Sequence, residues 1–491
     1  MDPRTPVLIG SGQRTHRAAS LAEARSPIVL MAEAVELAVA DAGLRHLPDI
    51  DLFTVVNTLS FRSADPARCA AAALGVSPAV SAVTTAGGNS PQALVNHAAA
   101  SIQQGELEFV VLTGGEARRS QRRGRAAGTK PWPDDPDPTP ADEMIGEEFV
   151  LSNPAELVRK IWLPIQIYPL FESALRATSG RTPAEHQAHL AALWARLAAV
   201  AADNPFAWNR AAPTATDIAT PGPKNRMIGW PYPKLMNSNN DVDQSAALLM
   251  CSVAKATELG VPRDRWVFPV SGTDCHEHPF ISNRWTFTET PAIGAGGRLA
   301  LELAGLGIDD IGVIDLYSCF PSAVQLGAAS LGLSLDRQLT RTGGLSFAGG
   351  PWNNYSMHAI ATVMNDLRND AGANGLVWAN GGFASKHAFG VYRTQPPTEG
   401  YRYASPQAMI DAGPQRACAD PADAAGAAVV EAYTVMHDRD GQPERAITSC
   451  LLADGRRAWG TSIDGQLAAA MIDGEWVGRT VTLKSDGVVV A

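Results

Sequence analysis

The chain of 491 residues is long enough for about three domains of ordinary size. Hydrophobic residues make up 45% of it and charged residues only 18%, so it has ample apolar side chains for folded cores and is not a disordered chain. Its 40 Lys and Arg against 50 Asp and Glu give a net charge of −10, which disfavours nucleic acid as a partner.

The cysteines and apolar runs exclude further classes of site. Six cysteines are spread along the chain without a CxxC pair, so we expect reduced thiols and no bound metal. No apolar run approaches the ~18 residues of a membrane span. The first residues hold only a brief apolar run, too short for a secretion signal. We therefore expect a cytoplasmic protein with no membrane span.

The first part of the chain predicts alternating helices and strands. Residues 28–42 are typical of a helix, with Ser26 as its N-cap, and residues 52–59 of a strand. Residues 86–116 then contain a Gly-rich turn, an Ala-rich helical stretch, a short apolar strand and a closing Gly pair. This order is the unit of a layered α/β fold.

Residues 118–243 differ in composition from what precedes them. They contain an Arg-rich stretch that begins at Arg118 and Arg119, an acidic Pro-rich stretch, and helical patterns near 171–177 and 184–202. An insertion of this size is typical of a lid domain, where substrate contacts often lie.

The second part repeats the pattern of the first. Residues 299–304 and 311–316 predict a helix and a strand, and residues 348–383 repeat the unit of turn, helix, turn and buried strand. Two copies indicate a duplicated α/β core. We expect an N-terminal half over 1–270, which includes the lid, and a C-terminal half over 271–395.

The end of the chain predicts a third domain over 396–491. A Pro-rich segment precedes it, and short alternating runs from residue 427 onward are separated by Asp-Gly turns. Many short strands with such turns favour a small β-barrel of the OB type.

Six motifs occur in the order in which sterol-carrier-type thiolases have theirs. They are LTGGE (112–116), DNPFAWNR (203–210), VDQSAALLM (242–250), DLYSCF (315–320), TGG…AGGP (342–351) and NGGFASKHAFGVYR (380–393). The chain therefore resembles the thiolase superfamily over roughly residues 5–395. The resemblance implies a five-layered α/β/α/β/α fold and a place in the acetyl-CoA acetyltransferase lineage of lipid metabolism. It also implies CoA thioesters as substrate or ligand without a bound cofactor, and a homodimer, although the added domain leaves a monomer possible.

Several residues of the thiolase mechanism are replaced. The family uses a cysteine at the N-terminus of the first-repeat helix, a histidine in a G-H-P turn and a second cysteine in a C-x-G turn. The resemblance places Gly87, Gly350 and Ala379 at these positions. Without a thiolate there is no covalent route for acyl transfer, so we do not expect ordinary thiolase turnover.

Three side chains remain as catalytic candidates. Tyr317 ends a buried strand and could donate a proton to an enolate, as in thiolase-like aldolases that pair with a small OB-fold protein. His358 follows the Gly-Gly-Pro turn and His387 follows the closing Gly pair. For all three, a buried structural role is the alternative interpretation.

Four further residues are expected to contact CoA or the substrate. Arg118 and Arg119 could bind the phosphates of CoA, because the guanidinium group binds phosphate well, although a solvated basic loop is an equal interpretation. Gly381 and Gly382 form the turn that the family places beside the thioester.

Three hypotheses follow. The first is a thiolase-like protein that binds CoA thioesters without ordinary thiolase turnover. The second is an aldolase-like carbon–carbon lyase that acts on a β-hydroxyacyl-CoA with a steroid or fatty side chain and uses Tyr317. The third is a non-catalytic acyl-CoA-binding or scaffold protein.

Overall fold

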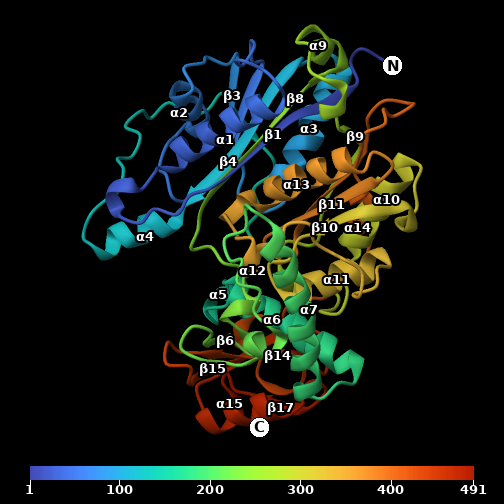
Figure 1. Cartoon of the computed structure of the whole chain (residues 1–491). Helices are drawn as coiled ribbons and strands as arrows, with labels where there is room; N and C mark the ends of the chain where they lie inside the picture. The colour runs from blue at the N-terminus through green and yellow to red at the C-terminus, as the bar shows by residue number, and fades with distance from the viewer. Residues whose placement is uncertain (491) are drawn as a thin grey trace.

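The computed structural model describes residues 1–490, and a six-stranded mixed sheet forms its N-terminal half (Figure 1). The strand order is β1-β8-β4-β2-β3-β5. Strand β8 alone runs antiparallel to its neighbours. The strands are β1 (Pro6–Thr15), β2 (Leu52–Val55), β3 (Val80–Thr84), β4 (Phe109–Ala117), β5 (Glu143–Ile145) and β8 (Asp243–Ser252).

A five-stranded sheet of order β10-β11-β12-β9-β13 forms the second half. Its strands are β9 (Phe268–His276), β10 (Ile311–Leu316), β11 (Asn374–Gly381), β12 (Lys386–Arg393) and β13 (Arg402–Ala404). The sequence of parallel and antiparallel pairs in β10-β11-β12-β9 is the same as in β2-β4-β8-β1 of the first sheet. This agreement confirms the predicted duplication.

Two buried helices lie between the sheets and further helices cover their outer faces. Helices α3 (Ser90–Gln104) and α13 (Tyr355–Asn369) each contact strands of both sheets. Helix α1 (Pro27–Asp41) packs on the first sheet, and α10 (Pro291–Ala304) packs on the second. The result is the expected α/β/α/β/α arrangement. Shorter helices complete it: α2 (Pro66–Ala73), α9 (Val253–Glu258), α11 (Pro321–Leu331), α12 (Gly344–Phe347) and α14 (Gln407–Asp411).

The insertion between β4 and β8 forms most of the middle of the molecule in Figure 1. The two predicted helical patterns lie in α6 (Pro164–Ser179) and α7 (Pro183–Asp203). Helix α6 contacts both α11 of the core and β14 of the C-terminal sheet, so it joins the two. The remaining elements are α4 (Arg118–Ala126), α5 (Pro154–Val158), α8 (Ala215–Ala219), β6 (Met227–Gly229) and β7 (Tyr232–Pro233).

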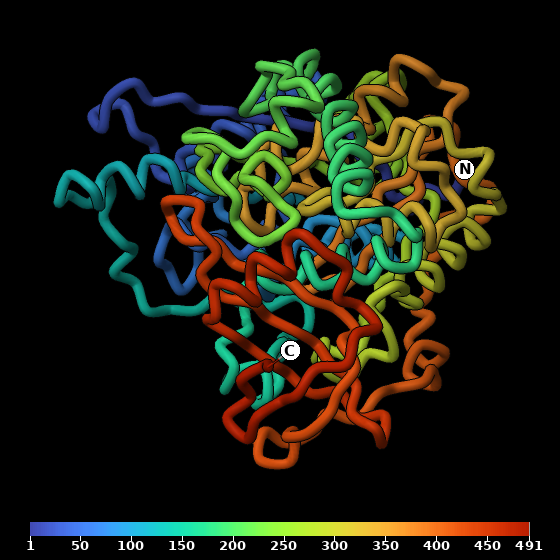
Figure 2. Tube along the Cα trace, turned by 90° about the horizontal axis from the view of Figure 1, so that it is seen from below, coloured from blue at the N-terminus to red at the C-terminus, as the bar shows by residue number. Residues whose placement is uncertain are grey.

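The C-terminal strands form a small barrel, which Figure 2 shows from below. The strand order is β16-β15-β14-β17-β18, and a bridge between Thr461 and Val488 joins the two ends. Strand β6 of the insertion extends this sheet by pairing with β14. The elements are β14 (Gly426–His437), β15 (Pro443–Leu452), β16 (Arg457–Ser462), α15 (Gly465–Asp473), β17 (Thr480–Leu483) and β18 (Val489–Val490).

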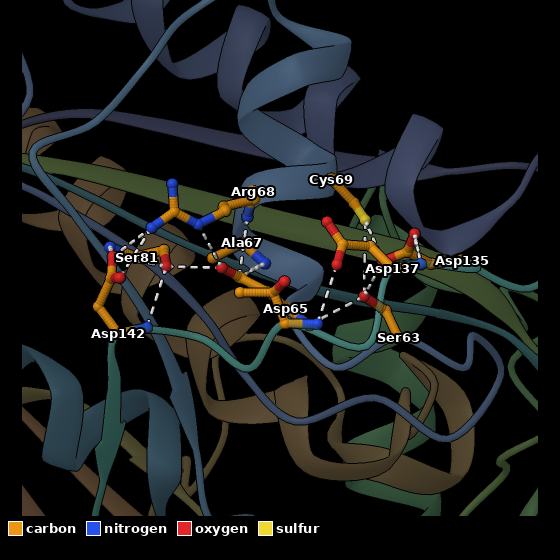
Figure 3. A network of polar contacts seen from close by, with 10 residues as sticks. Ser63, Asp65, Ala67, Arg68, Cys69, Ser81, Asp135, Asp137 and Asp142 are labelled. Carbon is orange, nitrogen blue, oxygen red and sulfur yellow. Dashed lines mark hydrogen bonds and ion pairs between the residues drawn. The ribbon is translucent and has the colours of Figure 1, made fainter.

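A polar network fixes the insertion against the edge of the first sheet (Figure 3). Arg68 of α2 donates to both carboxylate oxygens of Asp142 at 2.7 Å, and the backbone N–H of Ser81 donates to Asp142 at 2.9 Å. Nearby, Ser63 donates to Asp135 at 2.6 Å. These contacts hold β5 beside β3, so a short strand of the same chain covers the edge of β3.

No helix within residues 1–490 has the length and apolar character needed to cross a membrane. In the same part of the chain, no group of His, Cys, Asp and Glu side chains is arranged to hold a metal ion.

Candidate functional site

The N-terminus of α3 meets the second half of the core at two glycines. A Cβ atom at Gly88 would overlap the hydroxyl oxygen of Tyr317 and lie 2.5 Å from the carbonyl oxygen of Asn380. Only a glycine leaves room for this approach. Tyr317, directly after β10, therefore touches the start of the helix at which the thiolase family has its nucleophile.

The neighbouring Gly87 makes room for a lysine. A Cβ atom at Gly87 would lie 2.9 Å from Cε and 3.0 Å from Nζ of Lys386, the first residue of β12. Lys386 is only 6% exposed, and its amine donates a hydrogen bond to the carbonyl oxygen of Ala86. An amine thus occupies the space beside position 87. Lys386 is not among the residues expected from the sequence, although a lysine within a run of apolar strand residues is a signal for a functional side chain.

Gly381 and Gly382 form the turn after β11. Gly381 packs against the start of α3, because its Cβ atom would lie 3.2 Å from Cα of Gly87. Gly382 has a φ of +66° and its carbonyl oxygen accepts a hydrogen bond from the Tyr168 hydroxyl at 3.3 Å. The structure therefore brings Tyr317 and Gly381 together at one helix N-terminus.

Tyr317 is buried at this point. Its ring lies edge-on to that of Tyr355, with 5.5 Å between the ring centroids. Burial raises the pKa of Tyr317 well above its ordinary value, with a smaller contribution from the nearby Cys319. The hydroxyl group stays protonated and can act as a hydrogen-bond donor or a general acid.

Cys319 is the cysteine nearest to this site in sequence, and it is buried. Burial raises the pKa of its thiol to about 12. A thiol that keeps its proton is a poor nucleophile.

His358 lies apart from Tyr317. It is on α13, and its Nδ1 atom forms a 2.8 Å hydrogen bond with Oε1 of Gln13 from β1. Burial lowers the pKa of His358 to about 3, so the ring is neutral. His358 lines a cavity of about 10 Å³, which is too small for a substrate.

His387 packs against Trp378 and also lines a cavity of about 370 Å³ beside the N-terminus of α3. The indole Nε1 of Trp378 donates to His387 Nδ1 at 3.3 Å, and the two rings stack with 5.9 Å between their centroids. Burial lowers the pKa of His387 to about 3. Lys386 precedes it on the strand, so the two side chains project to opposite faces of the sheet. The structure does not bring the three candidate residues into one group.

Arg118 and Arg119 begin helix α4. The guanidinium of Arg119 lies 5.6 Å from the ring centroid of Trp208, and it is 4.0 Å from the Asp241 carboxylate. Arg17 lies over the same indole at 4.6 Å. Arg118 shares the first turn of α4 with Arg119 and does not line the cleft described next.

Trp208 lines a cleft of about 530 Å³ between the insertion and the core. Lys224, Arg226 and Lys234 also line it, and no carboxylate does so among the described residues. The cleft extends to Ser238, whose hydroxyl oxygen fills the space beside Gly350. A serine thus stands where the thiolase family has its activating histidine.

Comparison with known proteins gives a consistent result. Residues 406–488 match the family model described as the additional C-terminal domain of thiolase-like protein type 1. The chain is similar to one in the crystal structure of a monomeric SCP2-thiolase like protein type 1 from Mycobacterium smegmatis, with 32% sequence identity and a TM-score of 0.83. The match covers 100% of this chain and 99% of the Mycobacterium smegmatis chain. A structure described as an Ltp2-ChsH2(DUF35) aldolase is 20% identical, covers 80% of this chain and 98% of its own, and has a TM-score of 0.61. No curated protein matches the chain significantly.

Proposed function

Because the chain belongs to the family of SCP2-thiolase-like proteins of type 1, we propose that it binds a CoA thioester and does not perform acyl transfer through a cysteine. The observation that carries the proposal is the cleft beside Trp208, which Lys224, Arg226 and Lys234 line together with the indole ring. Cations suit the phosphates of CoA, and an indole offers a stacking surface for its adenine.

The position of the cleft supports the same conclusion. Its volume of about 530 Å³ falls within the range of small-molecule sites. Its Ser238 end lies against Gly350, so a long ligand with phosphates at the outer cations can place its acyl end toward the core. Arg119 and Arg17 lie against the Trp208 ring and add positive charge nearby.

The chemistry of the loops argues against a thiolase reaction. Gly87, Gly350 and Ala379 carry no nucleophile or base, and burial keeps Cys319 protonated by raising its pKa to about 12. A monomer fits the covered edge of β3 better than the homodimer that the thiolase resemblance implies.

The experiment is a calorimetric titration of the full chain with CoA, acetyl-CoA and longer acyl-CoAs. Replacement of both exposed lysines, Lys224→Glu and Lys234→Glu, is expected to weaken CoA affinity about 100-fold, roughly tenfold for each reversed charge. The matched control is Lys484→Glu, an exposed lysine of the barrel. Absence of CoA binding by the unaltered protein, or unchanged affinity in the double variant, would refute the proposal.

A second candidate is an aldolase-like lyase acting on a β-hydroxyacyl-CoA. The contact between the Tyr317 hydroxyl and Gly88 favours it, because a protonated phenol there can protonate an enolate formed beside the thioester. The barrel has the strand order of an OB-fold, which suits the analogy with an aldolase described with a DUF35 component. Tyr317→Phe is expected to abolish any β-hydroxyacyl-CoA cleavage while CoA affinity is kept. Equal cleavage by the unaltered protein and the variant would show that Tyr317 is not the acid of the reaction. A protein that binds CoA thioesters but cleaves none would fit the third hypothesis, a non-catalytic acyl-CoA-binding protein.

A further inference from the structure

We propose that Lys386 is a nucleophilic amine that forms an imine with a small aldehyde or ketone bound in the cavity beside the N-terminus of α3. The cavity has a volume of about 370 Å³. None of the described residues lines both this cavity and the cleft beside Trp208, so the inference goes beyond the proposed CoA site.

The surroundings of Lys386 disfavour its charged form. The side chain is 6% exposed, and within residues 1–490 it forms no salt bridge. Its amine donates to the Ala86 carbonyl oxygen and lies 5.7 Å from the ring centroid of Phe149. Burial lowers the pKa of Lys386, although the exposed Glu148 and Glu147 oppose this effect. A neutral amine is the form that attacks a carbonyl carbon.

The space around the amine arises from the fold of both halves. Gly87 has no side chain, and the Lys386 stem fills the space that one would occupy. The pairing of β12 with β9 places Lys386 opposite His276, and Ala388 opposite Asp274. Because side chains alternate along a strand, Lys386 and Asp274 project from the same face of the sheet into the cavity.

Asp274 lines the same cavity as Lys386, and we assign to it the proton transfers that imine formation needs. Its Oδ2 accepts from Asn96 at 2.9 Å, and its Oδ1 is buried without a hydrogen-bond partner in the described chain. Burial raises the pKa of Asp274 to about 6, so the carboxyl group can both give and take a proton near neutral pH. His97 and His276 also line the cavity.

The reaction is balanced without a further reactant. The Lys386 nitrogen forms a bond to the carbonyl carbon, and a proton moves from nitrogen to oxygen to give a carbinolamine. Loss of the hydroxyl group with a second proton releases water and leaves the carbon–nitrogen double bond. Asp274 carries the protons between nitrogen and oxygen.

Acetylacetone is the probe, because it condenses with a neutral lysine amine to an enaminone with a new near-ultraviolet absorbance and releases water. The full chain is treated at pH 7.5, and the adducts are mapped by peptide mass spectrometry. The chain has seven lysines, so each can be followed. Lys386 is expected to react faster than the exposed Lys484, because burial lowers the pKa of Lys386 and so leaves more of its amine neutral at pH 7.5. Equal rates at the two lysines would overturn the proposal.

Three variants sharpen the test. Lys386→Met should remove the fast phase, whereas Lys484→Met should keep it, with unfolding curves to show that both variants fold. Glu148→Gln alters an exposed loop and should quicken the Lys386 adduct about threefold, because the Glu148 charge raises the pKa of the amine. A fast phase that survives in Lys386→Met, or a rate unchanged in Glu148→Gln, would contradict the assignment.

Discussion

The cleft beside Trp208 and the cavity beside α3 both contain lysines, but their surroundings give these lysines different chemistry. Lys224 and Lys234 are exposed in a cleft without a lining carboxylate, where a hydrated ammonium group suits an anionic ligand. Lys386 is 6% exposed and donates to a backbone carbonyl. In these two proposals burial, rather than residue type, distinguishes a lysine that binds a charged ligand from one that reacts as an amine.

The cavity beside α3 and the cleft beside Trp208 also have a feature in common. Two of the three replaced catalytic positions of the thiolase family, Gly87 and Gly350, are glycines here, and in each case a side chain from elsewhere lies in the space beside the glycine. Lys386 fills the space at Gly87, and Ser238 fills that at Gly350. Loss of the family's catalytic side chains therefore left no void at either position, and the replacement groups are an amine and a hydroxyl.

The largest expected effect tests whether Lys386 occupies the space at position 87. Gly87→Ala should lower the free energy of unfolding by about 2 kcal/mol, because the new methyl group would overlap Oδ1 of Asn89 and lie 2.9 Å from Cε of Lys386. When Lys386 is also replaced by alanine, Gly87→Ala should lower the free energy of unfolding by about 1 kcal/mol less than it does in the unaltered protein. Urea unfolding of the two single variants and the double variant measures this coupling.

Gly465→Ala is the matched control, because nothing lies within 4 Å of a Cβ atom at Gly465. It should leave the free energy of unfolding nearly unchanged. Strictly additive effects of Gly87→Ala and Lys386→Ala on the free energy of unfolding would show that the two positions do not share this space. The conclusion that the Lys386 side chain fills the space beside Gly87 would then be wrong.

The sequence predicted the architecture well because its signals are local. The repeated unit of turn, helix and strand over 86–116 and 348–383 became α3 with β4 and α13 with β11, and the Asp-Gly turns predicted the strands of the barrel. Contacts between distant segments were not predictable in this way. The glycine at position 87 was recognised as a missing nucleophile, but nothing local to it indicated that Lys386 would fill the space. The pairing of β5 with β3 and of β6 with β14 was missed for the same reason.

The two histidine candidates show the same limit at the level of single residues. Their positions after glycine turns suggested a site, but position along the chain does not say which way a side chain points. The structure places His358 against Gln13, whereas His387 lies against Trp378 at the wall of the cavity beside α3. In these surroundings burial holds the pKa of each ring at about 3.

These buried rings extend the comparison from a buried lysine to buried histidines at acid pH. A histidine of the unfolded chain has a pKa near 6.5. Between pH 6.5 and about pH 3 each of these two rings is therefore protonated in the unfolded chain and neutral in the folded protein. The stability from each neutral ring is therefore present above pH 6.5 and is lost by about 1.4 kcal/mol per pH unit as the pH falls through this window. Urea unfolding at pH 7 and pH 5 should show a shallower loss for His358→Gln than for the unaltered protein, and likewise for His387→Gln, whereas replacement of the exposed His46 should not change the slope. If both buried-site variants kept the full slope, these histidines would be charged in the folded protein, and burial would not set the charge of its basic side chains.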